Sequence, residues 1–163
     1  MLGKLKGMFN KNSETMRIFA PVSGEAIALS MVNDETFSGE LLGKGVAIRP
    51  TSGRVVSPVN GTVAVMFETG HAVSLLADNG AEVLVHVGLD TVSLKGKHYT
   101  ARAKNGDKVR VGDILMEFDI SKIAATGYET VTPVVICNTG DYKAVEALTG
   151  RMVQEGEELI VLK

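Results

Sequence analysis

The residues best suited to chemistry are His71 and His86, which stand on either side of a tight-turn signal. The turn, Asp78-Asn79-Gly80, tolerates positive φ between two runs of alternating apolar residues, and this predicts a β-hairpin. Both histidines lie at roughly equal distances from the turn, so we expect them side by side on one face of a sheet. At neutral pH an imidazole keeps an unprotonated nitrogen, because its ordinary pKa is about 6.5. One ring can then act as a nucleophile or ligand while the other contributes a hydrogen bond.

A zinc site is a second use for this pair. Catalytic zinc normally takes three protein ligands and structural zinc four. His98 and Asp90 are the evident additional ligands, and neither completes a recognisable spacing. We therefore expect no required metal, although His71 and His86 could capture zinc when a partner supplies a third ligand.

Internal repeats indicate the framework that holds the histidines. Pro21-Val-Ser-Gly24 is echoed by Pro58-Val-Asn-Gly61, and residues 106–115 and 150–159 share the pattern G-x-x-V-x-x-G-[DE]-x-L. Turns that recur between short strands predict an all-β fold, an antiparallel β-sandwich or barrel with Greek-key connections. A few short helical turns are expected at residues 34–42, 120–125 and 141–148.

The same repeats also occur in lipoyl and biotinyl carrier domains, so a carrier domain of this kind is an alternative function. Their modified lysine stands at a hairpin tip, in a Met-Lys-Met or Asp-Lys-Ala context. The nearest match here, Asp141-Tyr142-Lys143-Ala144, has an intervening tyrosine and falls in an expected helix. This disfavours a carrier of that kind.

Length and charge restrict the function further. The chain has 163 residues and a net charge of −2, which fits a single domain over residues 16–163 and gives no indication of a nucleic-acid partner. Residues 1–15 read as a separate tail, either flexible or amphipathic on a membrane surface. The apolar and basic positions of the amphipathic alternative are Leu2, Leu5, Met8 and Phe9 with Lys4, Lys6 and Lys11.

Cysteine usage and hydropathy indicate a cytoplasmic protein. Cys137 is the only cysteine, so no internal disulfide forms. It follows the apolar run 134–136, which predicts a buried thiol in a reducing compartment. No apolar run approaches the roughly 20 residues that span a bilayer, and no signal peptide is evident. A peripheral position at the inner face of the membrane stays open through residues 1–15.

A docking surface is expected around the hairpin. Apolar residues gather in segments that also carry polar residues, and two aspartates flank them. The members are Phe37, Leu41, Leu42, Phe67 and Leu84, with Asp34 and Asp90. An apolar surface with an acidic rim suits a basic protein partner better than a small molecule.

Taken together, these motifs resemble one family, the glucose-type IIA component of the bacterial phosphoenolpyruvate-dependent sugar phosphotransferase system. The resemblance runs from about residue 17 to the C-terminus. The matching segments are 18–25, 45–50, 56–62, 67–72, 85–92, 95–96, 109–113 and 132–135. The histidine motifs Thr69-Gly-His71 and Val85-His86-Val-Gly-Leu-Asp90 are the most specific of them.

The resemblance implies a phosphocarrier without a cofactor. His86 matches the histidine that accepts the phosphoryl group, His71 the supporting histidine, and Thr69 a nearby hydroxyl. The family's docking surface matches the expected docking surface of this chain with Val87 added. Leu84 and Val87 stand where relatives can carry phenylalanine. The implied partners are the phosphocarrier protein HPr and a IIB domain of a sugar permease. Regulated permeases or kinases are further candidates.

Overall fold

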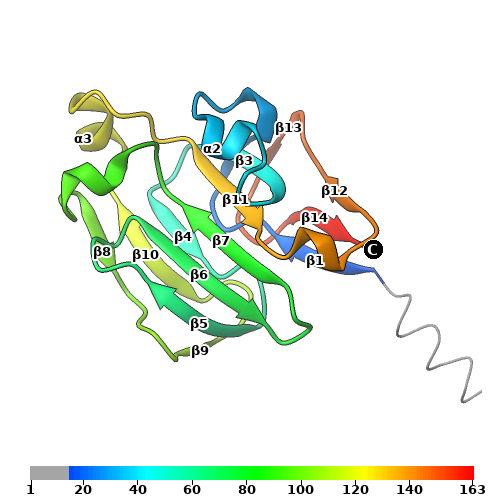
Figure 1. Ribbon diagram of the computed structural model, residues 1–163. Helices are drawn as coiled ribbons and strands as arrows, with labels where there is room; N and C mark the ends of the chain where they lie inside the picture. Colours follow the sequence, from blue (N-terminus) through cyan, green and yellow to red (C-terminus); the bar gives the residue numbers. More distant parts are fainter. Residues whose placement is uncertain (1–14) are drawn as a thin grey trace, which may run out of the picture.

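The computed structural model describes residues 15–163, which form three antiparallel β-sheets with a few short helices (Figure 1). The all-β antiparallel sandwich expected from the sequence is confirmed. The strands are β1 (Met16–Phe19), β2 (Gly24–Ala28), β3 (Lys44–Pro50), β4 (Arg54–Val56), β5 (Gly61–Met66), β6 (Ala72–Ala77), β7 (Glu82–His86), β8 (Tyr99–Ala101), β9 (Lys108–Val109), β10 (Ile114–Phe118), β11 (Thr132–Ile136), β12 (Val145–Ala147), β13 (Arg151–Val153) and β14 (Glu158–Leu162). The helical segments are η1 (Leu29–Met31), α2 (Glu35–Ser38), η2 (Thr91–Leu94), α3 (Ile120–Ala125) and η3 (Thr139–Asp141).

The largest sheet has eight strands in the order β13-β2-β3-β11-β7-β6-β5-β9. The consecutive strands β5, β6 and β7 are neighbours, and β9 returns to lie beside β5. This spatial order is that of a Greek key, as the turn pattern predicted. Two three-stranded sheets, β1-β14-β12 and β4-β10-β8, complete the sandwich.

The sequence repeats correspond to a repeat in the structure. Phe19 N donates to Pro58 O at 3.0 Å, and Val56 N donates to Pro21 O at 2.7 Å, so the strand before each Pro-Val-x-Gly segment bonds the proline of the other segment. Each segment then opens a strand with glycine, at β2 and at β5. A Cβ on Gly24 would lie 2.1 Å from Arg49 O, and one on Gly61 would lie 2.1 Å from Leu76 O. Glycine recurs there because a carbonyl of the paired strand occupies the space of a side chain.

Two apolar clusters cover the two faces of the large sheet. The main cluster includes Val73, Leu75, Val83 and Val85 and lies between this sheet and the two smaller ones. The second cluster contains Ala72 and Leu84 from the opposite face of β6 and β7, together with residues of η1 and α2. The helical segments η1 and α2 therefore cover the face onto which His86 projects by strand alternation.

Two helices were predicted correctly and one was not. The helices expected within 34–42 and at 120–125 are α2 and α3. Residues 141–148 instead contain the end of η3 and strand β12, which pairs with β14. The segment forms a strand because the edge of the small sheet offers backbone partners that a short helix cannot match.

The thiol of Cys137 was expected to be buried, and this was wrong. Strand β11 ends at Ile136, so the next side chain leaves the core and Cys137 is exposed. Its surroundings still desolvate the thiol in part, and this effect, reinforced by Glu82, raises the pKa of Cys137.

Residues 1–14, most of the expected tail, lie outside the described residues. We propose that residues 16–163 form one domain, because β1 pairs with β14 and so joins the two ends of this range. Within residues 15–163, no helix is long and apolar enough to cross a bilayer.

Candidate functional site

The predicted hairpin positions His86. Strands β6 and β7 pair antiparallel, and the turn closes with Ala77 N donating to Ala81 O at 2.8 Å. Gly80 has φ 97°, the left-handed conformation that glycine adopts without a side-chain penalty. His86 is the last residue of β7, at the end of the strand farthest from the turn.

His71 lies beside His86 in a way that strand alternation did not predict. The register pairs His86 with Ala72, so a regular strand would place His71 and His86 on opposite faces. Strand β6 begins only at Ala72, and His71 lies in the preceding turn, where Gly70 has φ 71°. The ring centroids of the two histidines are 4.9 Å apart with an interplanar angle of 82°. The rings lie together as expected, but the expectation that both belong to one strand face was wrong.

The backbone fixes the tautomer of His86. Its Nδ1 lies 2.7 Å from the carbonyl oxygen of Gly88. Because a carbonyl only accepts, Nδ1 carries the proton in this bond, and the lone pair of the neutral ring is on Nε2. Only glycine suits this position. Gly88 has φ 90°, and a Cβ on any other residue would lie 2.4 Å from Thr91 Cγ2.

His71 occupies a more enclosed position. His71 is only 3% exposed, whereas His86 is partly exposed. Thr69 Oγ1 lies 2.5 Å from Nδ1 of His71. The ring of Phe67 meets the His71 ring edge-on, with centroids 5.5 Å apart. Thr69 therefore hydrogen-bonds the buried imidazole, that of His71.

Both imidazoles favour the neutral form. Burial, with a further contribution from His86, lowers the pKa of His71 from 6.5 to about 4. Burial also lowers the pKa of His86, against the opposing effects of the Gly88 hydrogen bond and the Asp34 and Asp90 carboxylates. At pH 7 the site therefore holds two uncharged rings, one with an available nucleophilic nitrogen.

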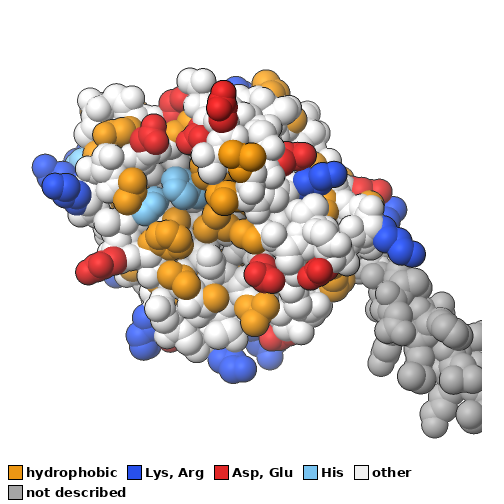
Figure 2. Space-filling view, viewed as in Figure 1, with side chains coloured by type: hydrophobic (Ala, Val, Ile, Leu, Met, Phe, Trp, Pro, Cys, Tyr) orange, Lys and Arg blue, Asp and Glu red, His pale blue; other side chains and the backbone are white. Residues whose placement is uncertain are grey.

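The expected docking residues divide into exposed and buried groups. Leu41 is 74% exposed, Leu42 40% and Phe67 37%, whereas Phe37 and Leu84 are buried in the second apolar cluster. Phe37 nevertheless packs against His86, with ring centroids 5.1 Å apart. Figure 2 shows hydrophobic side chains gathered around the adjacent imidazoles, with acidic side chains at the edges.

Val87 does not belong to this surface. It is 0% exposed and packs in the main core, so its side chain cannot contact a partner. The prediction for Val87 was wrong because side chains alternate along a strand. Val87 lies on the same face as Val83 and Val85, opposite to that of His86.

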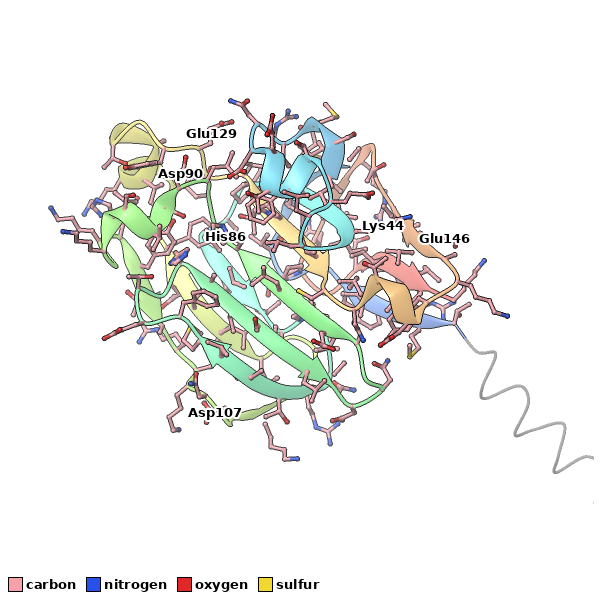
Figure 3. The ribbon with its side chains drawn as sticks, in the orientation of Figure 1. Lys44, His86, Asp90, Asp107, Glu129 and Glu146 are labelled. Carbon is pink, nitrogen blue, oxygen red and sulfur yellow. The ribbon has the colours of Figure 1, made fainter. Side chains whose placement is uncertain are left out.

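Two carboxylates, Asp34 and Asp90, act on the partly exposed ring of His86. Asp34 caps α2 by accepting a hydrogen bond from Thr36 N at 2.9 Å, and Asp90 precedes η2 with φ 58°. Asp90 and Glu129 lie on the same side of His86 in Figure 3. Over residues 15–163, no group of three or more His, Cys, Asp or Glu side chains could hold a metal ion.

Several contributors to the site were not predicted. The Gly88 carbonyl acts through its backbone, which leaves no side-chain signal in the sequence. Val65 and Leu76 are further exposed apolar residues of β5 and β6, at 43% and 48% exposure. Val65 was missed because the register of β5 shifts between Val63 and Val65, which turns the second valine outward.

Comparison with known proteins identifies the fold and the family. Residues 16–142 match the family described as the phosphoenolpyruvate-dependent sugar phosphotransferase system, EIIA 1. The solved structure of glucose permease IIA from Mycoplasma capricolum superposes with a TM-score of 0.85 at 34% identity, over 92% of this chain and 97% of that chain. The β-sandwich is that of a sugar phosphotransferase system IIA component. The chain belongs to the EIIA 1 family.

Two relatives illustrate the similarity. The beta-glucoside-specific EIIBCA component of Dickeya chrysanthemi is 48% identical over 145 residues, which cover 89% of this chain and 23% of that protein. The glucose-specific EIIA component of Oceanobacillus iheyensis is 42% identical over 151 residues, which cover 93% of this chain and 92% of that protein. The chain thus spans about a quarter of the EIIBCA relative and nearly all of the EIIA relative.

Proposed function

We propose that this protein carries a phosphoryl group on Nε2 of His86, receives it from phosphorylated HPr, and passes it to a cysteine of a IIB domain during sugar uptake. The single observation that carries the proposal is the Nδ1–Gly88 hydrogen bond of 2.7 Å, which leaves the lone pair of a partly exposed imidazole on Nε2.

The transfer balances without an added proton. The Nε2 lone pair of His86 attacks phosphorus as the P–N bond to the phosphorylated histidine of HPr breaks. The donor ring, protonated on its other nitrogen, keeps that electron pair and leaves as a neutral imidazole. The His86 ring retains its Nδ1 proton and becomes cationic, so the bond to the Gly88 carbonyl strengthens. In the second step a cysteine thiolate attacks phosphorus, and the His86 ring leaves in its original neutral form.

His71 and Thr69 support the transferred group. Thr69 donates its hydroxyl proton to Nδ1 of His71 in this proposal, which places the ring proton of His71 on Nε2. That N–H can then donate to a phosphoryl oxygen on the neighbouring ring. Such fixed donors matter because phosphoryl transfer depends mainly on positioning and on stabilising the oxygen charges.

The surroundings suit two protein partners in turn. The exposed side chains of Leu41, Leu42 and Phe67 offer an apolar contact, and Asp34 and Asp90 favour a basic partner. The names of the EIIBCA relatives join an A component with B and C components in one protein. This supports a IIB domain as the acceptor.

Incubation with phosphoenolpyruvate, enzyme I and HPr tests the proposal. The intact mass should rise by one phosphoryl group, about 80 Da, and the gain should be acid-labile. His86→Ala should abolish the gain, and His98→Ala should retain it as the matched control. Continued labelling of His86→Ala would assign the acceptor elsewhere. A modified Lys143 would support a lipoyl-type or biotinyl-type carrier, and stoichiometric zinc would support a metal protein.

A further inference from the structure

Tyr99 contacts both segments that carry the histidines. It begins β8, and its hydroxyl donates to the carbonyl oxygen of Val87 at 2.8 Å. Val87 directly follows His86, and its N–H donates to the His71 carbonyl at 2.7 Å. The backbone of Val87 thus joins the two histidine segments, and the hydroxyl of Tyr99 holds that junction from the other side.

The end of β7 explains why this hydroxyl is needed. Strand pairing in β7 stops at His86, so the Val87 carbonyl depends on side chains for its hydrogen bonds. Thr91 Oγ1 also donates to it, at 2.7 Å. Two hydroxyls therefore fix the direction in which the chain leaves His86 toward the Gly88 carbonyl.

The aromatic ring of Tyr99 packs near the imidazole of His71. Its centroid lies 6.5 Å from that of His71 at an interplanar angle of 77°, an edge-to-face arrangement. The same ring stacks against Phe118, with centroids 6.4 Å apart at 26°. The turn before His71 also packs closely here, since a Cβ on Gly70 would lie 3.5 Å from Tyr99 Cβ.

We propose that Tyr99 is a positioning residue for phosphoryl transfer: its hydroxyl fixes the chain beyond His86, and its ring fixes His71. The inference rests on the proposed function of His86. Small errors in the separation of reacting groups slow enzymes strongly, and the two imidazoles must keep their geometry through loading and unloading. Burial raises the pKa of Tyr99, so its hydroxyl stays protonated and donating at neutral pH.

Tyr99→Phe tests this role because it removes the hydroxyl and keeps the ring. We expect the kcat of onward transfer to fall about two- to tenfold, with KM for each partner within twofold, since Thr91 still bonds the Val87 carbonyl. Tyr142→Phe is the matched control. It removes a hydroxyl that is also partly desolvated and lies next to η3, outside the histidine contacts.

NMR of the imidazole nitrogens in the unphosphorylated protein supplies an independent readout. Tyr99→Phe should shift the resonances of His71 and His86, whereas Tyr142→Phe should leave both unchanged. Unchanged resonances with native kcat, or losses in kcat equal to those of Tyr142→Phe, would overturn the positioning role. Failure of the wild-type protein to gain a phosphoryl group would instead refute the proposed function, while the NMR comparison would still test Tyr99.

Discussion

The rings of His71 and His86 are 4.9 Å apart and nearly perpendicular, yet the two side chains differ sharply in accessibility. His71 is 3% exposed, whereas His86 is partly open to solvent. A partner protein can therefore reach the second ring and not the first. This difference in exposure suits the proposed roles of His86 as the phosphoryl acceptor and His71 as the supporting group.

Replacing His71 with glutamine should separate loading from release. Glutamine keeps an N–H donor but lacks the imidazole that Thr69 orients, so phosphorylation by phospho-HPr should continue. Transfer to IIB should slow by about 10²-fold, the usual cost of losing one oriented donor. Rapid-quench measurement of phosphoryl transfer gives both rates, and His98→Gln is the control. A native rate of onward transfer in His71→Gln would contradict the supporting role.

Acid should destabilise the protein between pH 6.5 and about 4. The pKa of His71 is lowered to about 4, while the unfolded chain titrates near 6.5. In that window the unfolded state binds more protons, so the free energy of unfolding falls as the pH falls. The lowered pKa of His86 acts in the same direction.

Urea denaturation at pH 7, 5.5 and 4.5 measures this effect, and His71→Gln should reduce the slope. NMR titration of the imidazole carbons reports the two midpoints directly. Midpoints at or above 6.5 for both rings would contradict the neutral pair.

Gly88→Ala should weaken both the fold and the site. The added Cβ would lie 2.4 Å from Thr91 Cγ2 and 2.9 Å from Glu129 O, at φ 90°. We expect a loss of about 2–4 kcal/mol in the free energy of unfolding and slower loading, because the carbonyl that holds His86 Nδ1 must move.

Gly80→Ala is the matched control for this substitution. It has φ 97° with no atom within 4 Å of the added Cβ, so only the backbone strain of about 1–2 kcal/mol applies. Equal losses in the two variants, measured by urea denaturation, would show that crowding at Gly88 is unimportant.

Leu41→Asp should weaken docking without affecting the fold. The side chain is 74% exposed, so the free energy of unfolding should change by less than about 0.5 kcal/mol. A new carboxylate in the apolar surface should raise KM for phospho-HPr about tenfold, which corresponds to about 1.4 kcal/mol. Met152→Asp, 62% exposed on the edge strand β13, should leave KM unchanged. The same KM in both variants would exclude Leu41 from the docking surface.

Local patterns predicted much of the scaffold. The Asp78-Asn79-Gly80 turn specified the hairpin, because few residues adopt positive φ there at low cost. The two Pro-Val-x-Gly repeats indicated the recurring strand entries, and the backbone carbonyls opposite Gly24 and Gly61 show why glycine is required. Residues 141–148 misled the prediction, since helix and strand differ little in such short segments until a neighbouring strand is present.

The sequence by itself determined the residues that can do the chemistry, because side-chain type and turn-forming residues are local properties. Residue type and spacing indicated His71 and His86 as candidates, and the family resemblance added Thr69, before any geometry was available. Only the tertiary structure decided which ring is accessible, which nitrogen carries the proton and which apolar residues face outward. These properties depend on the Gly88 carbonyl, on the register shift in β5 and on the packing of Tyr99, where backbone groups and distant segments meet across the sheets.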